Sequence, residues 1–241
     1  MTRQADPPTR RRAPGAVSRR RRRRRPWIAG GSVLLILVLI AAAVWAFAAQ
    51  PAPAPLALPR GTAAAPSGPA GGTWSAAPGS VAGFRVPEHS LGISSDVVGR
   101  TRAVTGTIVI AGGRVTAAQF RVRLAAITVG GKQEPQLAKS LGTRQHPAAI
   151  FTLTRPAALS PAFASGAVVT VRVTGELAMD GVLRPVTFTI SGRRDGAALQ
   201  AAGSIPVAFS RWDITGPGGA GFLGSLADHG VAEFRLTLDR T

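Results

Sequence analysis

The residue types that usually carry catalysis or bind metals are few and scattered in this chain of 241 residues. It contains no cysteine, which excludes disulfides, thiolate metal sites and cysteine nucleophiles. The three histidines, His89, His146 and His229, are far apart, whereas a hydrolytic zinc site typically takes closely spaced histidines and a carboxylate. No G-x-S-x-G turn supports a Ser-His-Asp triad. We therefore predict no catalytic residue, no metal site and no enzymatic activity.

Residues 216–221 match the G-x-G-x-x-G pattern of dinucleotide-binding turns. That function needs the turn between a strand and a helix, with an acidic residue about 20 positions later. Pro217 and the dense glycines around it indicate a loop instead. We therefore predict no nucleotide cofactor.

Arginines are the remaining groups with strong chemistry. Those that could bind an anionic head group such as a phosphate are Arg100, Arg102, Arg121 and Arg123. The interpretation that we favour for them is a solvated outer face of the strands. Eleven further arginines fall in the first 26 positions, against one acidic residue, Asp6. Clustered arginines can bind nucleic acid, but no interleaved aromatic residues accompany this block, so we predict no nucleic-acid partner.

An uncharged stretch follows the arginine block directly. Residues 27–49 run for 23 positions without a charge, and residues 33–40 consist only of Val, Leu and Ile. As a helix with a rise of about 1.5 Å per residue, this stretch covers the roughly 30 Å hydrocarbon layer of a bilayer. The sequence therefore predicts a single transmembrane helix, with the membrane as a partner.

Charge also predicts the orientation of this helix. Arginines 19–25 adjoin its start, so the positive-inside rule places residues 1–26 in the cytoplasm as a basic tail. The C-terminal part would then be extracytoplasmic, on a single-pass protein of the cell membrane. The alternative is secretion after signal cleavage near Ala48, because residues 46–48 (Ala-Phe-Ala) fit a small-x-small cleavage pattern.

Composition divides the rest of the chain into two parts. Residues 50–72 hold six prolines among Ala, Gly and Ser. This composition predicts an extended, semi-rigid linker of up to about 60–70 Å that isolates the C-terminal part of the chain from the membrane. Residues 73–241 are numerous enough to bury a core without disulfides, and we predict that they form one domain.

Apolar and polar residues alternate repeatedly within residues 73–241. In residues 169–174, for example, valine alternates with threonine and arginine. This pattern is typical of antiparallel strands with one face in water, and Asp-Gly dipeptides separate several of them as hairpin turns. Only residues 133–141 suggest a helix.

These strands predict an all-β fold. Closure into an antiparallel barrel of about eight strands would remove exposed edges, and a β-sandwich is the alternative. The interior of such a barrel is either filled by side chains or holds one ligand. Alternation does not separate the two cases, because a packed core and an apolar lipid tunnel use the same residues.

Several motifs resemble those of the YceI-like domain family. Residues 175–186 are similar to its G-x-L-x-x-x-G-x-x-[KR]-P-V hairpin, and residues 147–151 to its P-x-x-x-F strand start. Phe84, Gly99 and Gly106 support the resemblance by their order and spacing. The hairpin is the most specific of these motifs.

The resemblance covers about residues 73–240. It implies a lipocalin-like, extended antiparallel barrel that binds polyisoprenoid or other long-chain amphiphiles in its lumen, without catalysis. Residues 132–135 and the glycine-rich loop 216–224 depart from the family pattern, so the resemblance implies nothing about the head group of the ligand.

The leading hypothesis for function rests on this resemblance: an anchored, extracytoplasmic protein holds an isoprenoid or similar lipid for transport, sequestration or a stress response. The alternative is a packed-core barrel that acts as a cell-envelope protein-interaction module. The residues predicted to line the lumen share the apolar phase of the strands and are Phe84, Phe120, Val122, Leu124, Phe151, Leu153, Val171, Leu177, Phe188, Ile190, Phe209 and Phe234.

A retained anchor and a cleaved signal give different mature N-termini. We expect the mature protein to keep arginines 19–25, because the apolar run is longer than a usual signal core. N-terminal sequencing of the protein from its membrane fraction measures this. A sequence that starts at Ala49 would instead establish secretion after cleavage.

Overall fold

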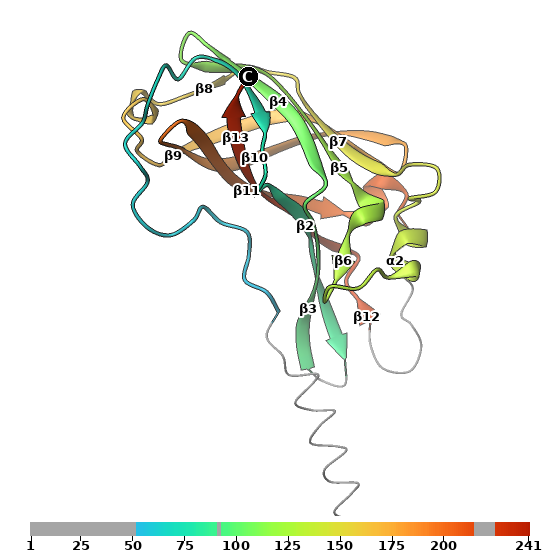
Figure 1. Cartoon of the computed structure of the whole chain (residues 1–241). Coiled ribbons are helices and arrows are strands. Elements are labelled where there is room, and N and C mark those ends of the chain that lie inside the picture. Colours follow the sequence, from blue (N-terminus) through green and yellow to red (C-terminus); the bar gives the residue numbers. More distant parts are fainter. Residues whose placement is uncertain (1–51, 91–92, 215–224) are drawn as a thin grey trace, which may run out of the picture. The chain divides into compact units, whose positions relative to one another are not determined.

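The structure is a computed structural model that describes residues 52–90, 93–214 and 225–241 (Figure 1). Residues 51–241 form one compact unit, and its alternating strands build an antiparallel barrel of eight strands. In order around the ring, these strands are β1 (Gly72–Ala76), β4 (Val104–Ala111), β5 (Arg114–Arg123), β7 (Ala148–Leu153), β9 (Val169–Met179), β10 (Val182–Asp195), β11 (Ala198–Ala208) and β13 (His229–Arg240).

Closure of the ring depends on its last strand. One edge of β13 pairs with β11 over ten residues. Its other edge is shared, since residues 238–240 pair with β1 and residues 231–235 pair with β2 (Val81–Ser90). Because β1 also pairs with β4, the sheet closes on itself.

Shorter elements extend and cover the ring. The sheet continues from β2 through β3 (Ile93–Thr101) to β6 (Thr128–Val129). The other described elements are η1 (Leu124–Ala126), α2 (Pro135–Ser140), β8 (Ala157–Ala158), η2 (Pro161–Phe163), η3 (Phe209–Trp212) and β12 (Ser225–Leu226), where η marks a 3-10 helix.

The predicted all-β barrel with one short helix is confirmed, and the sandwich alternative is wrong. The helix expected within residues 133–141 is α2, which begins at Pro135, where a missing N–H costs nothing. None of the described segments forms a helix that is long and apolar enough to cross a bilayer. The predicted span, residues 27–49, lies outside the described residues.

The two ends of the barrel differ in how they are closed. At the end that carries β1 and β8, here called the β1 end, Trp74, Leu199 and Leu238 are at most 3% exposed. The opposite end, here called the α2 end, carries α2, η3 and β12 (Figure 1). No residue of α2 is buried. The β1 end is therefore plugged by large apolar side chains. At the α2 end Trp212 of η3 is buried at 0% exposure, whereas α2 itself contributes no buried side chain.

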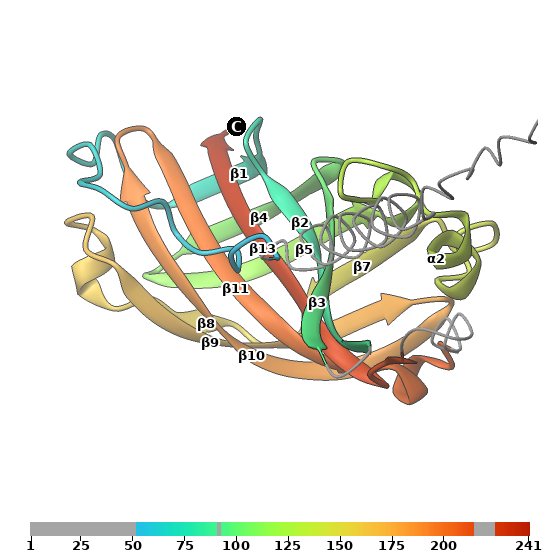
Figure 2. The same ribbon diagram turned by 90° about the horizontal axis from the view of Figure 1, so that it is seen from below.

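The described part of the predicted extended linker, residues 50–72, contacts the barrel. Residues 53–69, here called the strap, lie extended along the outer side of the barrel, across β10, β11 and β13 (Figure 2). A proline-rich extended segment makes no hydrogen bonds of its own, so its carbonyls are free to accept from neighbours. Arg193 and Arg194 of β10 donate to several of them.

The glycines on the inner face set the space available to the aromatic rings. A Cβ added at Gly175 of β9 would come 2.5 Å from Phe151 Cε2, so the ring or the strand would have to shift. We expect Gly175→Ala to lower the free energy of unfolding by about 1–3 kcal/mol.

Gly192→Ala on β10 is the matched control, because the nearest neighbour of its Cβ, Gln200 O, would be 3.4 Å away. Urea denaturation measures both variants. Equal stability of the two would contradict the close fit between Gly175 and Phe151.

Candidate functional site

The barrel encloses an apolar cavity of about 250 Å³. Its wall is built by inward-facing residues of the strands, together with Leu137 of α2 and Leu141, the residue that follows this helix. Ser140 and Glu233 are the only polar residues of that wall within the described chain. The Glu233 carboxylate accepts a hydrogen bond from Leu56 of the strap on the outer side of the barrel, so the Ser140 hydroxyl is the polar group that the described wall offers to the cavity, which suits an apolar chain.

Three aromatic rings from separate strands meet inside the cavity. Phe151 of β7 and Phe188 of β10 pack edge to face, with ring centroids 5.4 Å apart and an interplanar angle of 75°. Phe188 and Phe234 of β13 do the same at 6.0 Å and 81°. Such T-shaped pairs fix the rings against one another, so this side of the wall is rigid.

The inward-facing rings are not packed on all sides. Phe120, Phe151 and Phe234 point into the lumen and yet stay only half-buried, whereas Trp74 and Trp212 at the ends of the barrel are at most 1% exposed. A close-packed interior would leave such rings almost no free surface. The lumen is therefore not filled by side chains between these two tryptophans.

Glycines on neighbouring strands explain how large rings leave the lumen open. Gly106 of β4 pairs with Phe120, and a Cβ there would come 2.6 Å from the ring atom Cδ1. Gly99 of β3 stands in the same relation to Phe84 of β2, at 2.6 Å from Cζ. Each ring therefore occupies space that a side chain at the paired position would need.

All twelve residues predicted to line the lumen are on the wall of this cavity. That they contact a ligand stays a prediction. Sequence reasoning missed Leu137 and Leu141, in and directly after α2, although their spacing of four residues is a helical signal. It also missed Glu233, which alternation assigns to the solvent-facing side of β13.

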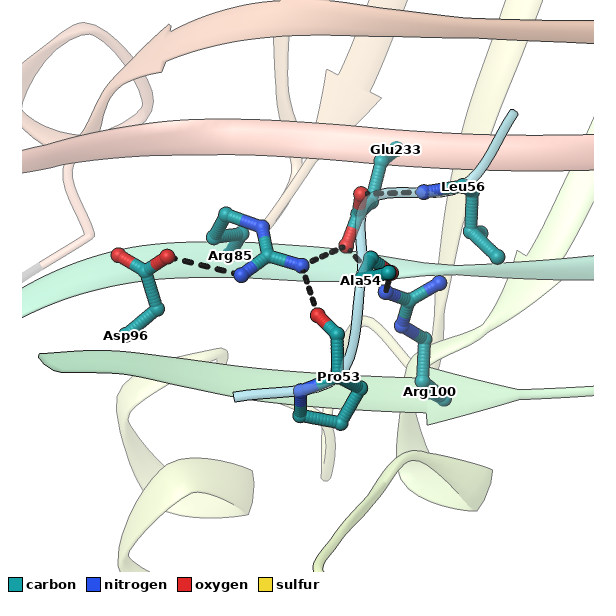
Figure 3. A network of polar contacts seen from close by, with 7 residues as sticks. All are labelled: Pro53, Ala54, Leu56, Arg85, Asp96, Arg100 and Glu233. Atoms are coloured by element: carbon teal, nitrogen blue, oxygen red, sulfur yellow. Dashed lines mark hydrogen bonds and ion pairs between the residues drawn. The ribbon is translucent and has the colours of Figure 1, made fainter. Parts of the chain in front are cut away.

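Glu233 is the centre of a buried polar network (Figure 3). It is 3% exposed, and its Oε1 lies 2.8 Å from Arg100 Nη2 and 3.7 Å from Arg85 Nη2. Neither contact is aligned as a hydrogen bond, so we treat both as ion pairs. Oε2 accepts a hydrogen bond of 3.0 Å from the Leu56 backbone N–H of the strap. Arg85 also pairs with Asp96 at 2.8 Å.

The network changes the interpretation of the strand arginines. Arg100 is not a fully solvated group, because its side chain is 20% exposed and pairs with Glu233. Burial lowers the pKa of its guanidinium, and the nearby Glu233 carboxylate opposes this effect. Arg102, Arg121 and Arg123 are exposed and lie away from the cavity wall. The structure therefore does not bring the four arginines together as one anion site.

The histidines lie outside the cavity wall. His89 shares a hydrogen bond of 2.9 Å with Ser94 Oγ, and His146 is an exposed residue beside Gly181. His229 bonds Asp228 at 2.9 Å, and this hydrogen bond lowers the pKa of the Asp228 carboxyl. No group of three potential metal ligands occurs in residues 52–90, 93–214 and 225–241. The G-x-G-x-x-G match at 216–221 lies outside these ranges.

A closed eight-stranded antiparallel barrel around an apolar cavity defines a lipocalin-like class of binding fold. Within that class, the chain belongs to the YceI-like domain family, which matches residues 75–238. The resemblance noted in the sequence is thereby confirmed at the level of the family. Comparison with curated proteins finds no match.

Two solved structures are similar to this chain. One is a polyisoprenoid binding domain from Saccharophagus degradans implicated in plant cell wall breakdown, with a TM-score of 0.56 and 16% identity over 71% of this chain and 99% of that chain. The other is BcnA from Burkholderia cenocepacia, with a TM-score of 0.47 and 20% identity over 64% of this chain and 95% of that chain. At 16% identity, the first likeness establishes the fold alone.

Glu233 balances two cations that are themselves largely buried, since the side chains of Arg85 and Arg100 are 14% and 20% exposed. We expect Glu233→Gln to lower the free energy of unfolding by about 2–4 kcal/mol, because it leaves these charges with less compensation. Asp239→Asn, at an exposed carboxylate of the same strand, should change it by less than about 0.5 kcal/mol. Chemical denaturation measures the free energy of unfolding of both variants. Equally small changes in the two would show that the Glu233 network does not stabilise the fold.

Proposed function

We propose that the barrel binds a long-chain amphiphilic lipid of the isoprenoid type, with the apolar tail in the cavity. The observation that carries this proposal is the hollow lumen, whose wall is apolar apart from Ser140 and Glu233. Burial of an apolar chain there is favourable by about 25 cal/mol per Å² of surface removed from water. The similarity to a solved polyisoprenoid binding domain supports the same class of ligand.

The size of the cavity limits how much of the ligand it holds. Its 250 Å³ is slightly below the roughly 300–1,000 Å³ of pockets that enclose drug-sized molecules. We infer that the lumen takes one stretch of a long chain, and that the head group stays outside. The α2 end is the exit, because Leu137 and Leu141 are half-buried there and line the cavity.

We further propose that residues 27–49 anchor the protein in the cell membrane, with the barrel on the extracytoplasmic side. The support is the arginine block followed by 23 uncharged residues. Secretion after cleavage near Ala48 is the alternative. In either case the barrel carries, sequesters or delivers a lipid and performs no chemistry on it.

The other candidate function, a packed-core interaction module, has no specific observation in its favour. It requires inward side chains that fill the barrel, whereas Phe120, Phe151 and Phe234 keep free surface in the lumen. The free surface of these rings therefore favours a binding cavity over a packed core.

Phe151 offers a direct test, because its ring faces the cavity and contacts Phe188. We expect Phe151→Ala to weaken binding of a polyprenyl phosphate about tenfold or more. It should also cost less stability than the roughly 3–5 kcal/mol of Phe→Ala in a close-packed core, since the space beside the ring is already open.

The matched control is Thr152→Ala, the next residue along β7, whose side chain contacts Gln119 instead of the lumen. Fluorescence titration and chemical denaturation give affinity and stability for both variants. Severe destabilisation by Phe151→Ala, with no lipid bound by the unaltered protein, would contradict lipid binding.

A further inference from the structure

The strap contacts the barrel along its whole length. Backbone carbonyls of the strap accept hydrogen bonds from a series of arginines, with these N···O distances: Arg100 to Ala54 at 3.0 Å, Arg193 to Pro59 at 3.0 Å and to Gly61 at 3.1 Å, Arg194 to Ser67 and Gly68 at 2.6 Å each, and Arg240 to Pro69 at 3.3 Å. Arg85 bonds the carbonyl of Pro53. The strap thus begins beside β2 and β3 and ends where β1 starts.

The strap is part of the domain, because buried charges depend on it. Arg193 is 8% exposed and Arg194 is 5% exposed. Their guanidinium groups bond strap carbonyls in addition to Gln200 and Ala164 of the rest of the unit. Release of the strap would leave two buried cations with fewer hydrogen-bond partners, which is costly. The docked strap is therefore the stable state.

The direction of the strap relates it to the open end of the cavity. Its C-terminal half lies at the plugged β1 end, where Ala64 N–H bonds Asp195 and Ser67 N–H bonds Gly196 O. Its first residues lie beside Arg85 and Arg100, on the two strands that extend toward the α2 end (Figures 1 and 3). Pro53, near the start of the described chain, therefore lies nearer to the α2 end than to the β1 end, since Arg85 pairs with Val231 near the beginning of β13.

Docking shortens the distance over which the barrel can move from its anchor. Between Ala49, the last residue of the predicted span, and Pro53, the chain reaches at most about 14 Å, at about 3.6 Å per residue. A free linker over residues 50–72 would reach about 60–70 Å. The docked strap thus removes most of the available reach.

We propose that the strap holds the barrel at the bilayer surface with its α2 end toward the lipid, so that the ligand passes between bilayer and cavity without crossing bulk water. This inference rests on the proposed function, both the anchor and the lipid ligand. The exposed basic residues around α2 are Lys132, Lys139 and Arg144, and the acidic residues nearest to them are Glu134 and Asp180, which lies beside Gly142. Basic residues at a surface attract anionic lipids.

Because the chain contains no cysteine, a single introduced cysteine can be labelled with a fluorophore at one chosen position. Gln136→Cys, on the exposed side of α2, and Ala111→Cys, at the turn after β4, each place one fluorophore at one end of the barrel in the full chain. The protein is reconstituted into vesicles of phosphatidylethanolamine and phosphatidylglycerol that carry a quencher on the head groups. We expect quenching at position 136 to exceed quenching at position 111 several-fold.

A linker variant provides the control. Insertion of 20 Gly/Ser residues between Ala52 and Pro53 leaves the strap docked but lengthens the connection. We expect it to equalise quenching at the two positions and to slow the transfer of a fluorescent polyprenyl phosphate from the vesicles to the protein several-fold. Equal quenching at both positions without the insertion, or failure of the protein to float with the vesicles, would overturn the inference.

The same samples separate this inference from the proposed function. If the protein binds polyprenyl phosphate but quenching is equal at positions 136 and 111, the membrane-facing arrangement is contradicted and lipid binding is not. Strong quenching at position 136 with no lipid ever bound would remove the proposed ligand and the exchange route, and so would overturn the inference. Unequal quenching together with slower transfer in the insertion variant supports it.

Discussion

The pairing of β1 with β13 closes the sheet, and the rest of the structure depends on that closure. Three residues of β1 pair with the end of β13 and four pair with β4, and β2 pairs with a further part of the β13 edge. In an open sheet, the apolar face of these strands would need another layer to cover it. In the closed ring, the apolar faces of all eight strands instead meet one another around a common lumen. The apolar cavity is a direct consequence of this topology.

Whether such a lumen is filled or hollow is decided by a small number of side chains. Glycines under Phe84, Phe120 and Phe151 let the rings lie along the wall, and large residues such as Trp74 are confined to the ends. Stability therefore comes from the plugged ends and the strand pairing, while the middle of the barrel stays available to a ligand. A packed core would be more stable but would have no space for a lipid tail.

Much of the fold and of the cavity could be predicted from sequence, because both depend on period-two alternation. Phe120, Phe151 and Phe188 were assigned to the lumen on that basis, and the structure places them there. Alternation failed at Glu233, because it cannot tell a polar residue in water from one buried beneath a docked segment. The strap itself has no periodic signal, and the two buried arginines that bind it, Arg193 and Arg194, are more than a hundred residues away in sequence.

The central claim is that the lumen holds a lipid, and native mass spectrometry of the purified full chain after removal of detergent tests it most directly. The unaltered protein should carry one bound molecule with the mass of an isoprenoid-type lipid. Ala201→Phe, which adds a ring to the cavity wall, should fold and lose that molecule. An unaltered protein that carries no lipid, or an Ala201→Phe variant that carries the same lipid equally well, would contradict the claim.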